Sequence, residues 1–515
     1  MSSIWFRCIR NIPLNYTESC LGTRKFILCD RNFFLVNKTS SIYTTVSNYN
    51  DRENPFKRTF RIISQDFKSI KDSIISSDKV VKPYHFPNYC DILIIGGGVM
   101  GFSIAYWLQE RVMDALKIVV VEKDPSVKFY SNKYIEYLKS TTVLSAGGIR
   151  QQFSLKENIE LSLYSAEFLR NLKLHLGIEG QEPPEINFNP TGYVFLASEK
   201  SAQIVIDNVN LQNSLGAKVE LLTPEKLKEK FPWMNIDGVA IASHGLENEG
   251  WFDPWSLLQA FKRKALYLGV DHVVGEITKF KFEENSFIVN DPVKSDRPNG
   301  VIVSLPDGTE KSINFSICVI AAGAMSGEVS KLAGIGCGPG ILSASLPVEP
   351  RKRYVHVVHC PEGPGFKCPF LIDYTGAYVR RDGINGNYIC GMSPLDEEEP
   401  SVDNLDVEGN FFEERVWPII AHRVPAFEKC KIKNCWAGFY DYNKFDENAF
   451  IGSHPVYPNL FFATGFSGHG IQQAPAIGRA VMEKLIDGEF KTIDLSRFGF
   501  ERYIDDKPLY ESNIV

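Results

Sequence analysis

The sequence lacks the cysteine and histidine spacings that mark zinc sites. It holds 11 cysteines and 9 histidines among 515 residues, but neither a C-x-x-C pair nor an H-E-x-x-H motif occurs. An odd number of scattered cysteines also argues against a disulfide framework and fits a reducing compartment. We therefore predict no metal site and no structural disulfides.

An excess of positive charge is also missing. The formal net charge is −6, and the hydrophobic content of 44% and charged content of 23% are ordinary for a globular protein. No long basic stripe interrupts this balance, so nucleic acid is not expected as a partner. A chain of this length is expected to form more than one domain.

The first 45 residues are unusually poor in acids. The charged residues there are the bases Arg7, Arg10, Arg24, Lys25, Arg31 and Lys38 and the acids Glu18 and Asp30. A basic, acid-poor and serine-containing N-terminus is typical of a mitochondrial transit peptide, although a tail without any targeting signal is the alternative. We predict a transit peptide over 1–45, a linker over 46–89, and a location in the mitochondrial matrix, free or at the inner membrane.

Long hydrophobic runs are absent as well. The best candidate is "DILIIGGGVMGFSIAYWL" at 91–108, in which 17 residues without a charge follow Asp91. A helix needs about 20 apolar residues to cross a bilayer core. This run falls short and carries three consecutive glycines inside it. We therefore predict no transmembrane segment.

The same stretch instead predicts a strand, a glycine-rich turn and a helix. A β-branched run at 92–95 is typical of a buried parallel strand, and Gly96-x-Gly98-x-x-Gly101 follows it. In such a turn Gly96 permits the tight bend, Gly98 lets a pyrophosphate approach the backbone, and Gly101 lets the helix pack closely on the strand. The helix N-terminus then favours the negative charge of the phosphates.

A second strand supports a dinucleotide site. The segment "KIVVVEKD" ends in Glu122, which lies 21 residues beyond Gly101. An acid at this distance is expected to bind a ribose hydroxyl, although a solvated acid after a strand is the alternative. Lys123, which follows it directly, is a further predicted cofactor contact.

Two more strands end in small residues. The run at 317–320 leads into Ala322 and Gly323, where small side chains let a backbone lie against a flat ligand or simply form a tight turn. The segment "LFFATGFSGHG" supplies Gly465, Gly468, His469 and Gly470. Its N–H groups and the following helix N-terminus can stabilise negative charge. A histidine in such a loop is more often a hydrogen-bonding residue than a catalyst.

The strands near 92, 317 and 460 are expected to form one sheet, so a second domain must be inserted between them. Segments such as "RKRYVHVVHC", "AYVRRDG" and "NYICGMS" alternate as antiparallel strands do. The first of these begins with the basic triplet Arg351, Lys352 and Arg353. We interpret this triplet as a solvated sheet edge without a functional role. Alternation then places Lys352 on the face opposite to the other two. The predicted domains are a dinucleotide-binding domain (90–184, 236–344 and 431–495), a substrate domain (185–235 and 345–430) and a C-terminal tail (496–515).

Six motifs together carry a family resemblance. They are "IIGGGVMG", "STTVLSAGGI", "ENEGWFDPWSLLQAF", "VIAAGAMS", "WAGFYDYNKFDENAFIG" and "GFSGHGIQQAPAIG". On these motifs the chain from about 90 to 495 resembles the D-amino-acid oxidase and sarcosine oxidase superfamily of FAD proteins. The resemblance implies an α/β fold, with a Rossmann-like FAD-binding domain of the glutathione-reductase type and an interleaved antiparallel-sheet substrate domain. It also implies hydride removal from a carbon next to an amine nitrogen, and Thr142 as a contact of the flavin loop.

The sequence departs from the superfamily pattern at positions that attach the flavin covalently and at one that binds the substrate. Sarcosine oxidases hold FAD through a cysteine at the position of Gly438, and dimethylglycine dehydrogenases through a histidine at the position of Leu144. Neither residue can bond a flavin, so we expect non-covalent FAD. The lysine that helps bind the substrate carboxylate is replaced by Gln472, while a second carboxylate ligand matches Arg150.

Other candidate residues remain open. Arg150 could instead hold a phosphate or form a surface ion pair. Tyr440 and Asp441 could line the flavin face or belong to the core. The predicted catalytic residues are Arg150, Gln472, His469 and Tyr440. The stretch at 127–140 is longer than relatives usually have, and nothing in the sequence explains its length.

Further motifs resemble a mitochondrial branch of the superfamily that is regarded as an assembly factor of respiratory complex I. These motifs are "GGIRQQFSLKENIELSL", "KFPWMN", "LPVEPRKRYVHV" and "RVPAFE". The resemblance implies complex I subunits or assembly intermediates as partners. The alternative is an enzyme that oxidises a secondary or N-methylated amine. The two functions are not exclusive, and Gln472 favours the assembly role.

Overall fold

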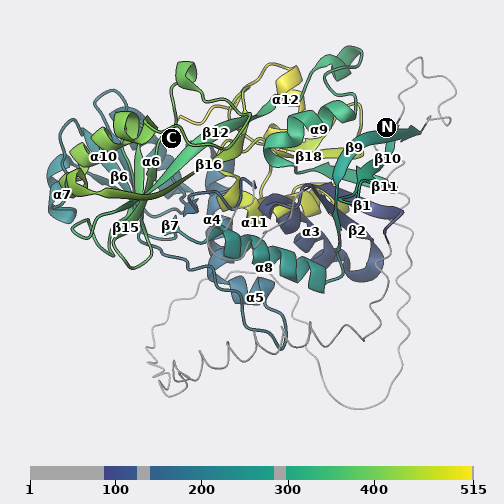
Figure 1. Ribbon diagram of the computed structural model, residues 1–515, viewed down its shortest axis with the longest axis horizontal. Coiled ribbons are helices and arrows are strands. Elements are labelled where there is room, and N and C mark those ends of the chain that lie inside the picture. Colours follow the sequence, from purple (N-terminus) through teal and green to yellow (C-terminus); the bar gives the residue numbers. More distant parts are fainter. Residues whose placement is uncertain (1–85, 124–139, 284–296, 513–515) are drawn as a thin grey trace. The chain divides into compact units, whose positions relative to one another are not determined.

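The three strands with glycine-rich ends meet in one sheet, as predicted. The computed structural model describes residues 86–123, 140–283 and 297–512 (Figure 1). In it β1 (Tyr89–Ile95), β11 (Glu310–Ile320) and β18 (Leu460–Thr464) lie side by side in the order β18-β11-β1, and both pairings are parallel. Their apolar runs are buried on both faces, as parallel strands require.

Five further strands complete this sheet. They are β2 (Ile118–Glu122), β8 (Asp271–Val274), β9 (Glu276–Glu283), β10 (Arg297–Ser304) and β17 (Phe450–Ser453). The main order is β17-β18-β11-β1-β2-β8, and the β9–β10 hairpin pairs with β11 through β10. The pairings of β17, β10 and β9 are antiparallel, whereas the central five strands run parallel.

Helices cover one face of this sheet. They are α3 (Val99–Val112), α4 (Lys156–Arg170), α5 (Leu172–Leu176), α8 (Pro254–Tyr267) and α11 (Gly470–Met482), with the short turns η2 (Met113–Ala115) and η8 (Glu483–Asp487). Side chains alternate along β1, so Ile92 and Ile94 pack against these helices while Leu93 and Ile95 face the β9–β10 hairpin. The opposite face carries α9 (Ser326–Leu332), η3 (Gly323–Met325) and η4 (Gly340–Ser343).

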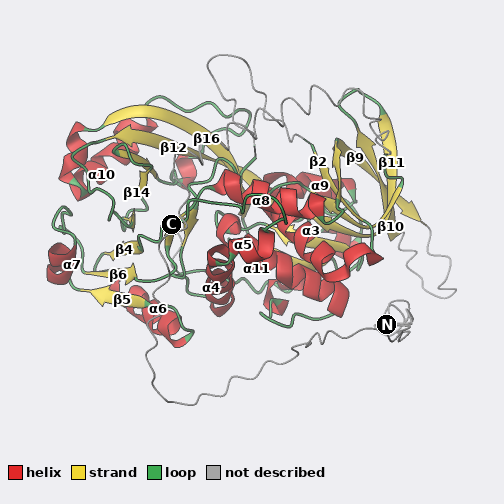
Figure 2. Ribbon diagram, turned by 90° about the horizontal axis from the view of Figure 1, so that it is seen from below, coloured by secondary structure: helices red, strands yellow, loops and turns green. Residues whose placement is uncertain are grey.

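A second sheet of eight strands forms the other lobe, which lies to the left in Figure 1. Its strands are β4 (Tyr193–Ala197), β5 (Val219–Leu222), β6 (Ile241–Gly245), β12 (Val348–His359), β13 (Phe370–Ile372), β14 (Tyr378–Asp382), β15 (Asn387–Gly391) and β16 (Lys431–Asn443). Their order is β16-β12-β15-β14-β13-β4-β6-β5. The long strands β12 and β16 arch from this lobe toward the first sheet (Figure 2).

This second sheet corrects two predictions. It is mixed rather than antiparallel, because β13 and β4 pair in parallel. The domain boundaries at 236 and 431 are also wrong. They assign β6 and β16 to the dinucleotide-binding domain, but β6 pairs with β4 and β5, and β16 pairs with β12 along its length. Both corrections depend on which strands pair across long separations in the sequence. Local sequence patterns do not reveal such pairing.

Short helices lie on both faces of the second sheet. One face carries α7 (Pro224–Lys230), α10 (Trp417–Arg423), η6 (Phe412–Val416) and η7 (Pro425–Lys429). The other face carries α6 (Ala202–Ser214), which packs against Ala197 of β4, while η5 (Asp396–Glu398) lies near Arg351 of β12. The strands β3 (Gly148–Ile149) and β7 (Gly250–Trp251) pair antiparallel and form a separate two-stranded sheet. The predicted α/β class, with a Rossmann-like domain and an interleaved second domain, is confirmed.

The C-terminal segment is not a free tail, which corrects the prediction for 496–515. It forms η9 (Ser496–Phe498) and α12 (Glu501–Ile504). Arg502 is buried and forms a bidentate ion pair with Asp446, with N–O distances of 2.7 and 3.0 Å. The segment is therefore part of the core through at least residue 511.

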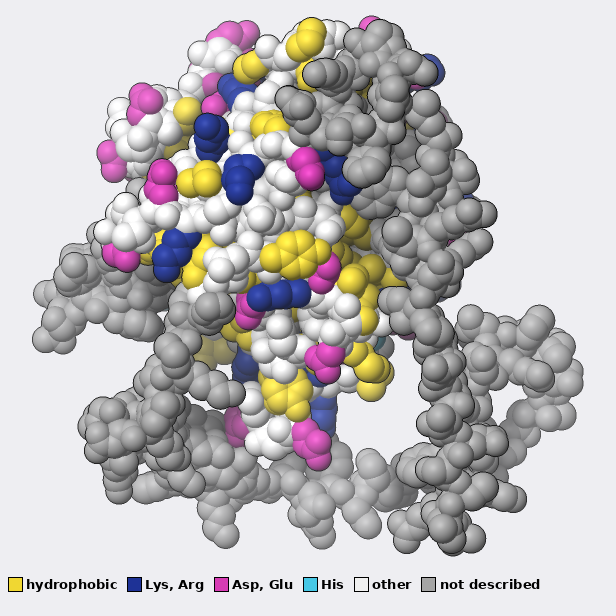
Figure 3. Space-filling view, turned by 90° about the vertical axis from the view of Figure 1, so that its right-hand side faces the viewer, with side chains coloured by type: hydrophobic (Ala, Val, Ile, Leu, Met, Phe, Trp, Pro, Cys, Tyr) yellow, Lys and Arg dark blue, Asp and Glu magenta, His cyan; other side chains and the backbone are white. Residues whose placement is uncertain are grey.

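Several predictions fall outside the described residues. These are the transit peptide at 1–45, residues 46–85 of the linker predicted at 46–89, and residues 127–139 of the long stretch at 127–140. In the part of the chain that is described, no helix is both long enough and apolar enough to cross a bilayer. On the face shown in Figure 3, basic and acidic side chains are interspersed among hydrophobic ones.

Candidate functional site

The glycine-rich turns gather at one edge of the first sheet. The turns follow β1, β11 and β18, whose carboxyl ends point the same way because the three strands are parallel. Ligands of open α/β sheets bind at this edge. The structure thus brings together Gly96, Gly98, Ala322, Gly323 and the loop 465–470, as predicted.

The three glycines of the first turn serve different purposes. Gly96 has a φ of +111°, and a Cβ atom there would collide with the main-chain oxygen of Ala321. A Cβ on Gly101 would collide with the oxygen of Gly96. A Cβ on Gly98 would meet only the Thr142 hydroxyl, at 3.4 Å. The first two glycines therefore serve the fold, while the surface above Gly98 is open to a ligand.

Side chains around this turn are arranged to hold it. Glu122 ends β2, and its carboxylate accepts the N–H of Gly97 at 2.6 Å. The Thr142 hydroxyl accepts the N–H of Val99, at the start of α3, at 3.2 Å. Lys123 instead points to Glu276, with which it forms an exposed ion pair. The cofactor role of Lys123 stays a prediction.

The loop 465–470 is held from the second sheet. The buried carboxylate of Asp441, on β16, accepts the N–H groups of Gly465 at 2.8 Å and Phe466 at 3.0 Å. Burial raises the pKa of Asp441 to about 6, although these main-chain bonds oppose the shift. Asp441 therefore supports the loop, and it is not among the residues that line the cavity described next.

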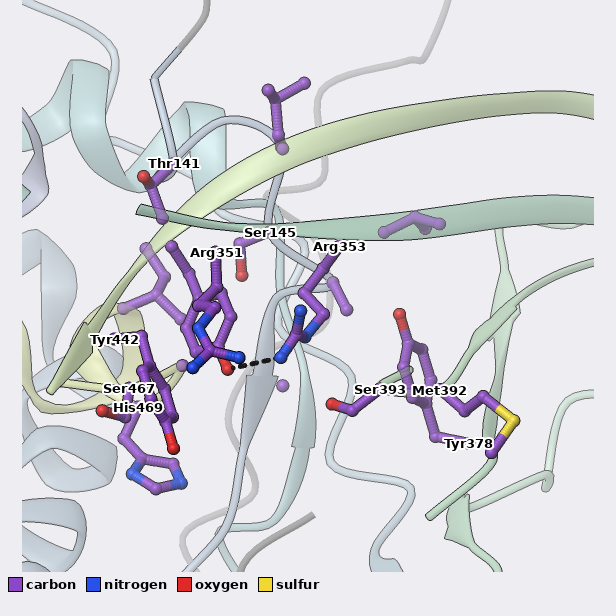
Figure 4. A pocket seen from close by; sticks show the side chains of 18 of the residues that line it. Thr141, Ser145, Arg351, Arg353, Tyr378, Met392, Ser393, Tyr442, Ser467 and His469 are labelled. Atoms are coloured by element: carbon purple, nitrogen blue, oxygen red, sulfur yellow. Dashed lines mark hydrogen bonds between the residues drawn. The ribbon is translucent and has the colours of Figure 1, made fainter. Parts of the chain in front are cut away.

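A cavity of about 400 Å³ lies where the two lobes meet (Figure 4). Its wall combines the loop 141–150, β12, β16, the inner face of the second sheet and the start of α11. Figure 4 shows Tyr442, Ser467 and His469 on one side and Tyr378, Met392 and Ser393 on the other. All four predicted catalytic residues, Arg150, Gln472, His469 and Tyr440, line this cavity.

Arg150 is a buried cation in an aromatic cage. Its side chain is 5% exposed, and its guanidinium lies 4.7 Å from the ring centre of Phe153 and 4.9 Å from that of Phe195. Its Nε atom has no hydrogen-bond partner. Among the described residues, no carboxylate forms an ion pair with it. Burial accordingly lowers the pKa of Arg150, and the surface ion-pair alternative is excluded.

His469 is an uncharged neighbour of this cation. Burial, together with the charge of Arg150, lowers the pKa of His469 to about 3. Its Nε2 atom lies 3.4 Å from Nη2 of Arg150. Because a guanidinium can only donate, Nε2 must accept, and the imidazole proton resides on Nδ1. His469 is thus too weak a base to take a proton at neutral pH.

Gln472 and Tyr440 are held by hydrogen bonds, and the Ser162 hydroxyl is one of the donors to Gln472, at 3.4 Å. The side-chain oxygen of Gln472 accepts the main-chain N–H of Arg150 at 2.9 Å, which leaves its NH₂ group as a donor at the cavity. The Tyr440 hydroxyl accepts from Arg353 at 2.9 Å, and burial raises the pKa of Tyr440 to about 12. Tyr440 therefore stays protonated at neutral pH.

The basic triplet on β12 is not a solvated edge, so that interpretation is wrong. Arg351 and Arg353 line the cavity and both contact Glu399 at 2.8 Å. Lys352 lies on the opposite face, as its alternation predicted, and is 2% exposed. It donates to the main-chain oxygen of Asp406 at 3.1 Å. The segment from Glu399 to Asp406 is therefore bonded to both faces of β12.

Sequence reasoning missed an aromatic wall of the cavity. Tyr193 and Phe370 stack with ring centres 4.3 Å apart, and Tyr378 follows at 5.8 Å from Phe370. The strand-like alternation of "GYVFLAS" and "GAYVRRDG" could have shown that these side chains share faces. Nothing local could have shown that three separate strands bring them together.

Comparison with known proteins decides the family. The family model described as FAD dependent oxidoreductase matches residues 91–484. The chain belongs to this family. It is 54% identical over 460 residues to FAD-dependent oxidoreductase domain-containing protein 1 of Xenopus laevis, covering 87% of this chain and 90% of that protein. The Bos taurus protein of the same name is 50% identical over 424 residues, covering 81% and 85%.

Solved structures agree with this family. The L-proline dehydrogenase of P. horikoshii superposes with a TM-score of 0.67 at 26% identity, covering 82% of this chain and all of that one. Glycine oxidase from Geobacillus kaustophilus shares the fold, with a TM-score of 0.61 at 20% identity, covering 80% of this chain and 98% of that one. FAD is therefore the cofactor of this oxidoreductase, bound without a covalent link.

The residues around the cavity fit FAD held in this way. The open surface over Gly98 and the start of α3 suit the pyrophosphate, and Glu122 suits a ribose. Leu144 and Gly438, where relatives carry attachment residues, both line the cavity. Neither has a nucleophilic atom, which agrees with non-covalent binding.

Proposed function

We propose that this protein is an FAD-dependent oxidoreductase of a secondary or N-methylated amine that carries a carboxylate. The observation that supports this substrate class is Arg150, a buried cation on the cavity wall without a carboxylate partner among the described residues. Burying an unpaired charge is costly, and a bound anion would offset that cost.

Three features suit a carboxylate at this point. The phenyl rings of Phe153 and Phe195 hold the guanidinium in place without neutralising it. The NH₂ group of Gln472 adds a neutral donor beside it. The aromatic wall formed by Tyr193, Phe370 and Tyr378 offers apolar contact for the rest of an amine. Together these groups would orient a carboxylate-bearing ligand within the cavity.

Arg150 and Gln472 would position the substrate, and two other predicted catalytic residues, His469 and Tyr440, do not take its proton. FAD, when bound, supplies the oxidising power that removes a hydride from the carbon next to nitrogen. His469 and Tyr440 have pKa values of about 3 and about 12, so neither serves as a base near neutral pH. The amine would therefore bind with its nitrogen already uncharged, or release its proton to water or to a carboxylate of the cavity wall.

Binding of a simple carboxylate tests this site. Benzoate should perturb the flavin absorbance of the purified holoprotein, and Arg150→Ala should weaken its binding at least tenfold, by about 1.5–3 kcal/mol. Flavin content should not change. Arg497→Ala is the matched control, because Arg497 is an exposed arginine paired with Glu157. Equal benzoate affinity of Arg150→Ala and the unmutated protein would rule out the anion site.

As a second candidate, we propose that the protein supports assembly or stability of respiratory complex I, with complex I subunits or assembly intermediates as partners. Gln472 favours this role, because an amide that bonds the main chain of Arg150 replaces a lysine of the oxidases. Of the two positions that the resemblance assigns to the substrate carboxylate, only Arg150 is then a cation. Rescue of complex I activity in cells lacking the protein separates the roles. Retained rescue by Arg150→Ala, with loss for Gly98→Val, would favour assembly, whereas failure of both would favour catalysis.

We further propose a mitochondrial location. The support is the acid-poor sequence of residues 1–45. Deleting residues 2–45 should leave the protein in the cytosol, as measured by cell fractionation. Unchanged mitochondrial location of the deletion variant would contradict the transit peptide.

A further inference from the structure

Glu249 is a buried acid directly beside the anion site. It precedes β7, and the antiparallel register pairs Gly148 with Trp251 and Ile149 with Gly250. Continuing that register by one step places Glu249 opposite Arg150. Cross-strand neighbours of opposite charge ordinarily attract each other. Glu249 is 1% exposed, yet it does not form an ion pair with Arg150.

Both oxygens of Glu249 are held by amide donors instead. One accepts the main-chain N–H of Gln151 at 2.7 Å, and the other accepts the side-chain NH₂ of Gln152 at 2.7 Å. Gln152 also donates to the main-chain oxygen of Tyr193 at 3.1 Å. A Cβ atom on Gly245 would collide with the Glu249 carboxylate, so β6 leaves just enough room for it. The carboxylate is therefore fixed between the two lobes.

We propose that Glu249 is a positioning residue that keeps Arg150 open to a carboxylate ligand and tunes that ligand's affinity through its own charge. This inference rests on the proposed anion site. Held by Gln151 and Gln152, Glu249 cannot swing over to neutralise the guanidinium. When it is ionised it still interacts with the charge of Arg150, so it would weaken the binding of a carboxylate there, because charges interact strongly in a buried site.

The charge of Glu249 changes near neutral pH. Burial raises its pKa to about 7, while the bonds from Gln152 and Gln151 and the charge of Arg150 oppose the shift. Of the titratable groups on the surrounding elements, Arg150 and Tyr193 interact with Glu249.

The remaining titratable neighbour is His244 on β6, which pairs with Glu220 instead. Arg150 stays charged, and burial raises the pKa of the Tyr193 phenol, so of these three groups it is Glu249 that titrates near pH 7. An anion should therefore bind more tightly below that pH than above it.

Benzoate titrations at several pH values test this, because benzoate stays ionised above about pH 5.5. In the unmutated holoprotein its Kd should rise about three- to tenfold between about pH 6 and pH 8, a change of about 0.7–1.4 kcal/mol. Glu249→Gln should remove most of that dependence. Glu489→Gln, the same change at an exposed acid, should keep it.

Calorimetry of the unmutated holoprotein gives a second measurement if Glu249→Gln fails to fold. A bound anion must raise the pKa of Glu249, so benzoate binding near pH 7 should take up a fraction of a proton. Benzoate binding in buffers of different ionisation enthalpy reveals that uptake. Absence of proton uptake, or full pH dependence in Glu249→Gln, would overturn the role of Glu249. A protein that binds no benzoate at any pH would instead overturn the anion site itself.

Discussion

Leu144 and Gly438 lie against each other in the cavity wall. A Cβ atom on Gly438 would sit 3.0 Å from the Cβ of Leu144, closer than ordinary van der Waals contact. One residue comes from the loop before β3 and the other from the middle of β16. Different relatives attach FAD at one or the other of these positions. Their contact explains how either position can reach the same part of the flavin. In this protein the Leu144 side chain packs directly against Gly438.

A double-mutant cycle tests this contact. Gly438→Ala alone should destabilise the holoprotein by about 1 kcal/mol, because the new methyl group crowds Leu144. Leu144→Gly removes that Cβ atom and makes room for the methyl group, so the double variant should be more stable than the sum of the single effects. Thermal unfolding of the four proteins with saturating FAD measures this. Strict additivity would contradict the direct contact.

Gly98 and Gly101 should fail in different ways. Gly98→Val should lose FAD yet keep a folded apoprotein, because a side chain there meets only the Thr142 hydroxyl. Gly101→Ala should destabilise the apoprotein itself by about 3 kcal/mol or more, because its methyl group collides with the Gly96 oxygen. Flavin content and urea unfolding of both variants distinguish the cases. Normal flavin content in Gly98→Val would show that this turn does not bind the cofactor.

Asp441 should make stability depend on pH. Its pKa in the folded protein, about 6, lies above its value in the unfolded chain. The folded state therefore binds this proton more tightly, and the stability it contributes is present at low pH and lost as pH rises through about 6. Asp441→Asn keeps an oxygen for the N–H groups of Gly465 and Phe466 but cannot titrate. Relative to this variant, the unmutated protein should lose of order 2 kcal/mol between about pH 4 and pH 7. Parallel urea curves at all pH values would contradict this.

Glu511 supplies the missing cap of α4. The helix has no side-chain cap of its own, and the Glu511 carboxylate accepts the N–H groups of Ser154 at 2.6 Å and Leu155 at 3.2 Å. Glu511→Ala should cost about 2 kcal/mol of stability, since the Ser154 hydroxyl and the side-chain NH₂ of Asn158 donate to it as well, and all four donors lose their acceptor. The exposed Glu489→Ala is the control. An unchanged melting temperature for Glu511→Ala would show that the C-terminal segment does not stabilise the helix.

Much of the fold could be predicted because its signals are local. The glycine turn at 96–101, the acid at 122 and the loop at 465–470 each follow a buried strand within a few residues. The resemblance added Arg150 and Gln472, and the structure places both in one cavity with His469 and Tyr440.

The remaining features depend on contacts between distant segments. β6 and β16 look like strands of either domain, and only their partners assign them to the second sheet. Asp441 and Glu249 are ordinary acids in the sequence. Their roles arise because main-chain N–H groups from other segments meet them in buried positions. The cap from Glu511 likewise spans more than 350 residues of chain.

Anaerobic mixing of the purified holoprotein with N-methyl amino acids tests the central claim most directly. The account predicts that at least one carboxylate-bearing secondary amine removes the visible absorbance of the flavin. The same amine without its carboxylate should fail, and Arg150→Ala should respond at least tenfold more weakly. If no such amine bleaches a flavin that dithionite does reduce, or if the carboxylate makes no difference, an amine-oxidising function built on Arg150 is contradicted.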